Sequence, residues 1–191
     1  MATKTLTEKQ EARRQRVIQA ALEAAASGGY DAVQMRDVAA EAGVALGTLY
    51  RYFSSKDQLL VATLAQWARE LQQEIATHPL RGESPADRVV EVLRRAVKAL
   101  ETAPKLTTAL VTALSSMSSE DPEALAYADN VAGTMAEIIA GAVDGGTEQH
   151  TAAVRALGLL WFATLVAWVR GWGPPEQMME DLESAARLLF R

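Results

Sequence analysis

Residues 38–56 read VAAEAGVALGTLYRYFSSK, a stretch with two short helical patterns on either side of a glycine. These patterns predict helices over about 34–42 and 46–52, separated only by Gly43-Val44-Ala45. Two short helices joined by a three-residue turn with a glycine are typical of a helix-turn-helix unit. The apolar side chains support this interpretation because they can form one small core: Val38, Ala39, Val44, Leu49 and Phe53.

The second helix of this unit has side chains that suit nucleic acid. Thr48, Tyr50 and Arg51 offer hydroxyl, aromatic and guanidinium groups, which contact phosphates and base edges in protein–DNA complexes. Gly47 has no side chain, so DNA can approach the backbone closely there. Lys56 lies in the first turn of the following helix, where a cation opposes the helix dipole unless a phosphate lies nearby. These features predict a DNA-binding surface.

The same spacing also fits a protein that does not bind DNA. A tight corner with glycine is common between helices, and the aromatic side chains of Tyr50, Tyr52 and Phe53 can belong to a core. For Phe53 the core is the preferred interpretation. A helical lipid-binding or carrier protein without DNA binding is therefore the alternative function.

The composition favours an all-α fold. The 191 residues include 36 alanines and 22 leucines, which form helices readily, against 19 valines and isoleucines, which favour strands. The absence of cysteine and the presence of only two histidines exclude a disulfide scaffold, a thiol nucleophile and a cysteine- or histidine-rich metal site. The sequence has no P-loop, Gly-x-Ser-x-Gly or His-Glu-x-x-His motif, so we expect no enzyme activity, no cofactor and no metal ion.

Capping, glycine and proline signals predict nine helices. They cover about residues 7–27, 34–42, 46–52, 55–77, 85–103, 104–116, 122–144, 148–170 and 175–190. Thr7 with Gln10, and Ser55 with Gln58, have the spacing of a capping box. The first three helices form the predicted helix-turn-helix domain, residues 1–54, and the remaining helices form a C-terminal bundle, residues 55–191.

Charge is distributed unevenly along the chain. Residues 1–67 contain eight Lys and Arg against seven Asp and Glu, whereas the remainder contains eleven against seventeen. The net charge of −5 alone argues against nucleic-acid binding, but the locally basic N-terminal segment is compatible with it.

The N-terminus lacks the apolar run of a secretory signal. The most apolar stretch, between Arg155 and Arg170, has 14 uncharged residues, whereas a membrane span needs roughly 20. We therefore expect a buried core helix there, in a soluble, cytoplasmic protein without a membrane partner.

The N-terminal motifs resemble the TetR family of transcriptional regulators. The likeness lies in Gly28-Gly29-Tyr30, Ala42-Gly43-Val44, Gly47-Thr48-Leu49-Tyr50-Arg51-Tyr52-Phe53 and Ser55-Lys56. It implies a homodimeric, ligand-responsive repressor of double-stranded operator DNA, with the second helix of the unit in the major groove. The positions that the resemblance assigns to DNA contact are Gln34, Arg36, Gly47, Thr48, Tyr50, Arg51, Tyr52 and Lys56. Many relatives have a polar pair at Ala45-Leu46, so base readout by Leu46 is limited to a thymine methyl.

A narrower resemblance is to the KstR-type branch of this family, regulators of cholesterol and steroid catabolism. It rests on residues 30–36, residues 47–53 and Leu165-Val166-Ala167-Trp168. It implies a large, mostly apolar effector, such as a steroid or an acyl-CoA thioester. A CoA group would need cations, and the sequence offers a cluster that also fits a solvated helix face: Arg94, Arg95, Lys98 and Lys105.

The C-terminal bundle is predicted to bind this effector and to form the dimer. Apolar residues can line a cavity, although core packing is the simpler explanation for each: Trp67, Leu71, Leu106, Leu110, Leu114, Met117, Tyr127, Met135 and Trp161. Polar groups for the cavity are Thr107, Thr108, Thr112 and Asn130. The family's four-helix interface would use Val154, Leu157, Leu165, Trp168, Met178, Leu182, Ala186 and Leu189. The alternative is a monomer that buries the whole helix at 148–170.

Overall fold

The computed structural model describes residues 7–117, 122–143 and 148–191. Within these ranges the chain forms nine α-helices and one short 3₁₀ helix, and no strand, so the predicted all-α fold is confirmed. The elements are α1 Glu8–Gly28, η1 Tyr30–Ala32, α2 Met35–Glu41, α3 Leu46–Tyr50, α4 Lys56–Thr77, α5 Pro85–Glu101, α6 Pro104–Ser116, α7 Pro122–Ala142, α8 Glu148–Val169 and α9 Pro175–Leu189.

Side-chain caps begin the helices near the predicted positions. The capping box expected at the start of α1 is present. At α4 the hydroxyl of Ser55 accepts a hydrogen bond from the backbone N–H of Gln58 (3.1 Å). The amide oxygen of Gln58 accepts from the N–H of Ser54 rather than from that of Ser55. Because the Gln58 side chain is buried, this bond fixes the loop between α3 and α4.

Two local features differ from the prediction. α3 ends at Tyr50 rather than at Tyr52, and a 3₁₀ turn, η1, connects α1 to α2 where the sequence predicts no helix. Gly29 has a φ of +76°, and a Cβ added to Gly28 would collide with the Cβ of Ala32. The two glycines therefore allow η1 to fold back against the end of α1.

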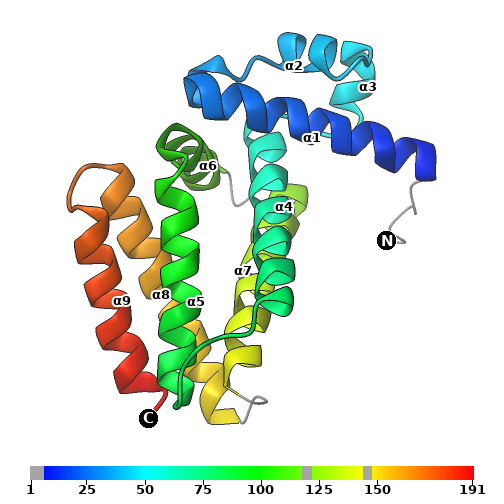
Figure 1. Cartoon of the computed structure of the whole chain (residues 1–191). Coiled ribbons are helices and arrows are strands. Elements are labelled where there is room, and N and C mark those ends of the chain that lie inside the picture. Colours follow the sequence, from blue (N-terminus) through cyan, green and yellow to red (C-terminus); the bar gives the residue numbers. More distant parts are fainter. Residues whose placement is uncertain (1–6, 118–121, 144–147) are drawn as a thin grey trace.

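Figure 1 shows α1 lying across one end of the molecule, with α2 and α3 beside it and α4 leading away into the bundle. Helices α5, α7, α8 and α9 run alongside one another below this unit. α6 lies at the junction and packs against α1, η1 and α4. The helix-turn-helix unit is thus exposed at one end of a helical bundle.

The buried apolar residues form two cores. One core joins α1 to α4 around Phe53, which is fully buried, and includes Leu110 from α6. The other joins α5, α7, α8 and α9 around Leu93 and Leu182. Val111, the residue after Leu110, belongs to the second core. Adjacent residues of α6 therefore pack in different cores.

α8 is less buried than the sequence predicts. Residues His150–Val169 are long and apolar enough to span a membrane by length and composition, yet only 22% of this stretch is buried within the chain. One such helix is weak evidence for a membrane span, and α8 packs in the bundle against α6, α7 and α9. The alternative of a single chain that buries the whole helix is contradicted, because Leu159 and Phe162 are exposed.

Candidate nucleic-acid interface and ligand cavity

The turn between α2 and α3 is held by backbone and side-chain hydrogen bonds. Gly43 has a φ of +63°, which glycine adopts without strain, and the N–H of Val44 donates to the carbonyl of Ala39 (2.9 Å). The guanidinium of Arg16 on α1 donates to the carbonyl of Ala42 (3.2 Å). These contacts, together with the buried inner side of α3, fix the direction of its outer face.

The outer face of α3 is open to solvent. Tyr50 is 50% exposed, Arg51 is exposed and Thr48 is half-buried. A Cβ added to Gly47 would have no heavy atom within 4 Å, so packing within the chain does not require glycine there. An open backbone beside hydroxyl, aromatic and guanidinium groups can contact phosphates and groove edges.

The side chain of Lys56, in the first turn of α4, contacts Tyr30, the first residue of η1. Its Nζ donates to the carbonyl of Tyr30 (3.2 Å) and lies 3.7 Å from the centroid of the Tyr30 ring. The Tyr30 hydroxyl in turn donates to Asp57 Oδ1 (2.5 Å). Burial, reinforced by this hydrogen bond and the negative charge of Asp57, raises the pKa of Tyr30 to about 12. The ammonium group is therefore positioned at the start of α4 before any phosphate arrives.

The remaining predicted DNA-contacting residues lie on the same unit. Gln34 is the N-cap residue of α2 and donates from its amide to the carbonyl of Asp31 (2.8 Å), and Arg36 is exposed on α2. Tyr52 is half-buried, with its ring centroid 6.5 Å from that of Phe53. The eight predicted residues thus come from α2, from α3 with the residues after it, and from the start of α4. Their contact with DNA stays a prediction.

A cavity of about 800 Å³ lies in the bundle, with walls from α4 to α8. Four of the predicted cavity residues line it: Trp67, Leu114, Met135 and Trp161. Leu71 is buried in the second core, whereas Leu110 is buried in the first core with Leu106 and Met117 against it. Leu71, Leu106, Leu110 and Met117 therefore pack between helices and do not line the cavity. The side chain of Tyr127 lies outside the described residues.

Sequence reasoning missed most of the wall that α8 supplies. The wall residues there recur every three or four positions along the helix: His150, Thr151, Val154, Arg155, Gly158, Leu159, Trp161, Phe162 and Leu165. Extending the helical period from Trp161 in both directions would have found them. Every residue of α8 from position 156 to 163 is apolar or glycine, so no polar residue in this part of the helix marks the side opposite the cavity.

The predicted polar and cationic groups do not line the cavity. The hydroxyl of Thr107 is buried and donates to the carbonyl of Leu100 (2.8 Å). Arg94 pairs with Glu91 and Glu183. The other polar candidates are also outside the wall: Thr108, Thr112 and Asn130, with Arg95, Lys98 and Lys105.

Two of these cations connect segments of the chain. Arg95 donates to the carbonyls of His78 (2.8 Å) and Pro79 (3.3 Å), and Lys105 donates to that of Ser27 (2.9 Å). Arg95 and Lys105, two of the four cations considered for a CoA group, therefore stabilise a loop and a helix end, and the cation in the cavity wall is Arg155.

The predicted dimer residues need a correction. Six of them are buried within the single chain and offer no surface to a second subunit: Val154, Leu157, Leu165, Met178, Leu182 and Ala186. Trp168 is half-buried, and Leu189 is exposed. The apolar side chains that α8 and α9 do expose include Leu159, Phe162 and Leu188. The helices chosen from the sequence thus have exposed apolar residues, but apart from Leu189 most of them are not the predicted ones.

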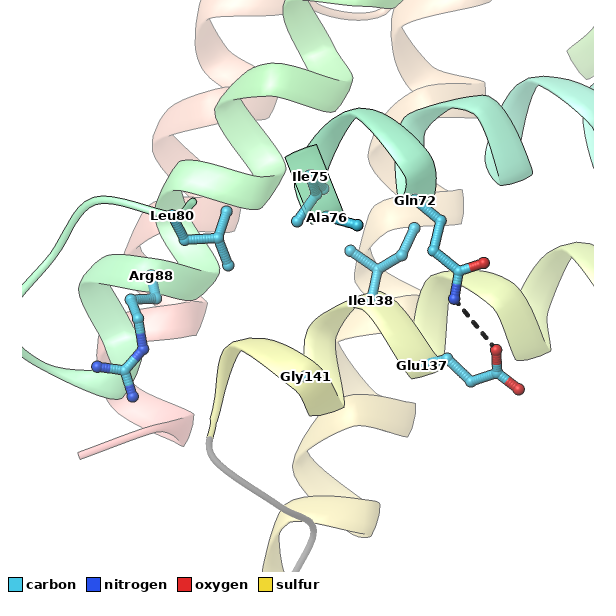
Figure 2. Close-up of a pocket in the computed structure, with 8 residues that line it drawn as sticks. All are labelled: Gln72, Ile75, Ala76, Leu80, Arg88, Glu137, Ile138 and Gly141. Atoms are coloured by element: carbon cyan, nitrogen blue, oxygen red, sulfur yellow. Dashed lines mark hydrogen bonds between the residues drawn. The ribbon is translucent and has the colours of Figure 1, made fainter. Parts of the chain in front are cut away.

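A smaller cavity of about 410 Å³ lies between the end of α4, the start of α5 and the end of α7. Figure 2 shows the Gln72 amide directed at Glu137, to whose carboxylate it donates (3.3 Å). Arg88 donates from Nε to the carbonyl of Ala142 (2.8 Å) and so connects α5 to α7. α7 contributes residues to both cavities, and Glu137 lines both.

Comparison with known proteins identifies the family. Residues 17–63 match the TetR family of bacterial regulatory proteins, and residues 82–189 match a tetracycline repressor-like C-terminal domain. The chain is 36% identical over 183 residues to the transcriptional repressor KstR of Rhodococcus jostii (strain RHA1), covering 95% of this chain and 84% of that protein. It is 35% identical to KstR of Mycolicibacterium smegmatis over 186 residues, covering 96% and 90%.

Solved structures agree with this assignment. A TetR transcriptional regulator from Rhodococcus sp. RHA1 superposes with a TM-score of 0.85 at 34% identity, covering 95% of this chain and 97% of that one. Thermus thermophilus FadR, a TetR-family repressor solved with lauroyl-CoA, gives a TM-score of 0.71 at 23% identity over 92% of each chain, which supports the fold. The KstR relatives are transcriptional repressors and not enzymes, which favours a DNA-binding regulator over a carrier. This chain belongs to the TetR family of bacterial regulatory proteins and resembles its KstR repressors.

Proposed function

We propose that this chain is a homodimeric repressor that inserts α3 into the major groove of operator DNA, residues 1–54 forming the DNA-binding domain. The outer face of α3 carries the proposal: it is exposed and has an open backbone at Gly47. Gln34 and Arg36 on α2 and Lys56 on α4 are suited to phosphates on either side of the groove. Because operator DNA is the partner, the protein acts in the cytoplasm.

The dimer forms, in this proposal, through the exposed apolar face of α8 and α9. Ala152, Ala156, Leu159 and Ala163 are exposed at positions i, i+4, i+7 and i+11, so they form one stripe along α8. Leu188 is an exposed apolar residue of α9, the helix that packs against α8. Small residues beside a leucine allow two helices to approach closely, and a second copy of the chain would cover the stripe.

Two measurements test the DNA-binding proposal. Footprinting should show an inverted repeat with half-site centres roughly 34–36 Å apart or a multiple of that. Lys56→Ala should lower the slope of log affinity against log salt by about one unit, because a phosphate contact releases counterions. The matched control is Lys98→Ala, an exposed lysine on α5, which should leave the slope unchanged. Protection of a single asymmetric half-site by monomer would contradict the proposal.

The effector, in this proposal, is a large and mostly apolar molecule that binds the cavity formed by residues 55–191. The cavity volume of about 800 Å³ and its apolar wall support this chemistry. The resemblance to KstR repressors favours a steroid or its acyl-CoA thioester as the ligand. α4 connects the cavity wall at Trp67 to the helix-turn-helix unit, so the effector acts by favouring a different position of α4.

Operator release separates the effector classes. Steroid acyl-CoAs should release the protein from DNA at lower concentration than straight-chain acyl-CoAs or small aromatic drugs. Equal release by every acyl-CoA would remove the steroid assignment and leave the repressor intact. Release only by a small, highly charged ligand would contradict the apolar cavity as the effector site.

A further inference from the structure

A residue in the wall of the larger cavity has an unsatisfied polar atom. Among the described residues, two buried side-chain atoms lack a hydrogen-bond partner, Nδ1 of His150 and Oε1 of Gln66. Of these two residues, His150 lines the larger cavity. A buried nitrogen without a partner costs free energy that a ligand with a suitable oxygen would recover.

The His150 ring is held in place from the side of α9. Its centroid lies 6.1 Å from that of Phe190, with 38° between the ring planes, and Phe190 itself is buried at the end of α9. The imidazole is therefore supported by the second core while it forms part of the cavity wall. A side chain supported in this way presents its nitrogens at a defined position to a ligand.

His150 also lies at one end of the cavity. The wall residues of α8 extend from His150 in the first turn to Leu165, which is about 22 Å of helix at 1.5 Å per residue. α8 begins at the end of the bundle away from α1–α3 (Figure 1). The cavity is thus elongated, and its unsatisfied nitrogen lies far from the helix-turn-helix unit.

We propose that His150 determines effector specificity by hydrogen-bonding one uncharged oxygen, a hydroxyl or a carbonyl, at the end of an elongated apolar effector. This inference rests on the proposed effector function of the cavity. The oxygen is uncharged because the wall is mainly apolar and its cation, Arg155, is exposed to solvent, and burying a charge without a partner costs far more than burying a hydroxyl that is hydrogen-bonded. A hydroxyl both donates and accepts, so it matches either tautomer of the imidazole.

The test compares 1-tetradecanol with tetradecane, two probes that differ in a single terminal oxygen. Trp67 and Trp161 line the cavity, so quenching of tryptophan fluorescence reports binding of either probe. His150→Phe should raise the dissociation constant of the alcohol relative to that of the alkane by about 3- to 10-fold, which is the effect of losing one net hydrogen bond. The matched control is Thr151→Val, the neighbouring polar residue of the wall, which should keep the wild-type ratio.

Histidine NMR gives a second measurement that does not depend on a variant. The chain has only two histidines, and His78 lies exposed between α4 and α5, away from the wall. The imidazole nitrogen signals of His150 should move on addition of the alcohol and move less with the alkane, while those of His78 stay in place.

The outcomes separate this inference from the proposed function. Absence of binding by both probes would count against the cavity as an effector site. Binding of both probes with the same ratio in wild type and His150→Phe, or no movement of the His150 signals, would overturn the role of His150 alone. Should His150→Phe fail to fold, the NMR experiment on the wild-type protein decides.

Discussion

The helix-turn-helix unit and the C-terminal bundle bury their apolar residues to different extents. In the unit, Leu49 and Phe53 are fully buried. In the bundle, Trp67 and Trp161 face a cavity of about 800 Å³, and Leu159 is 66% exposed. The core of the helix-turn-helix unit is therefore fully packed within one chain, whereas the bundle has a cavity inside and exposed apolar side chains outside.

This difference follows from what each region has to contact. DNA is read by groups on an outer surface, so a fully packed interior that holds α3 still is an advantage. A ligand and a second subunit instead need apolar surface that the chain itself does not cover. Incomplete packing in the bundle is thus the feature that permits regulation.

Two matched leucine-to-alanine substitutions, one in each region, test this difference most strongly. Leu49→Ala removes a fully buried side chain and should lower the free energy of unfolding by about 3–5 kcal/mol. Leu114→Ala, in the cavity wall, should cost less than about 2 kcal/mol, because its side chain already has empty space on one side. Urea denaturation of both variants measures the two values. Equal losses would mean that the cavity is filled in solution.

A pair of charge substitutions tests the uncovered face of α8. Leu159→Glu should weaken the dimer by about 30-fold or more while each subunit stays folded, because the side chain is exposed until a partner covers it. Leu165→Glu should unfold the subunit instead, since Leu165 is only 5% exposed. Sedimentation gives the mass, and circular dichroism gives the folded state. A wild-type monomer at micromolar concentration would rule out this interface.

Gly47→Ala should have opposite effects on stability and on DNA binding. The added Cβ has no neighbour within 4 Å, and alanine favours a helix by about 1 kcal/mol over glycine, so the free energy of unfolding should not fall. Operator affinity should decrease about tenfold, roughly 1.4 kcal/mol, because the methyl group occupies space that DNA needs. Thermal melting and a binding titration measure the two effects. Unchanged affinity would remove Gly47 from the contact surface.

Tyr30→Phe should have the smallest effect. It keeps the ring under Lys56 and removes the hydrogen bond to Asp57, at a cost of about 1 kcal/mol near neutral pH. The pKa of Tyr30 is raised to about 12, so the unfolded chain loses this proton at lower pH than the folded protein does. Wild-type stability should therefore fall between about pH 10 and 12, relative to Tyr30→Phe. Urea denaturation across this range measures the difference, and a constant difference would contradict the assignment.

Local signals in the sequence were sufficient for the helices and for the helix-turn-helix unit. Thr7 with Gln10 and the Gly43 turn depend on neighbours within a few residues, so the sequence alone shows their pattern. The helical spacing of Leu49 and Phe53 marked them as core residues, although the core that buries them also includes α1, α4 and α6. The same stretch predicted DNA binding, because the hydroxyl, aromatic and guanidinium groups on the outer face of α3 do not contribute to the core.

The walls of the bundle could not be predicted in the same way. Which face of α8 meets the cavity, the core or solvent depends on how distant helices pack, and α8 is apolar on all sides. Leu157 and Leu165 resembled interface residues but are buried, whereas Leu159 is exposed. Arg95 and Lys105 resembled an anion site, and their contacts with distant carbonyls become visible only in three dimensions.

The participation of α6 in the N-terminal core limits how regulators of this kind can be recombined. A chimera that exchanges only residues 1–54 would pack a foreign α1 against Ala109, Leu110 and Ala113 of the host, and Lys105 would keep its bond to the backbone carbonyl at position 27 only if the foreign α1 ends in the same place. Chimeras that exchange α6 together with α1, α2 and α3 should therefore fold more often than those that exchange the first three helices alone. The same should hold for paralogues that diverge after gene duplication. Substitutions on α1 and α6 are expected to accumulate in pairs.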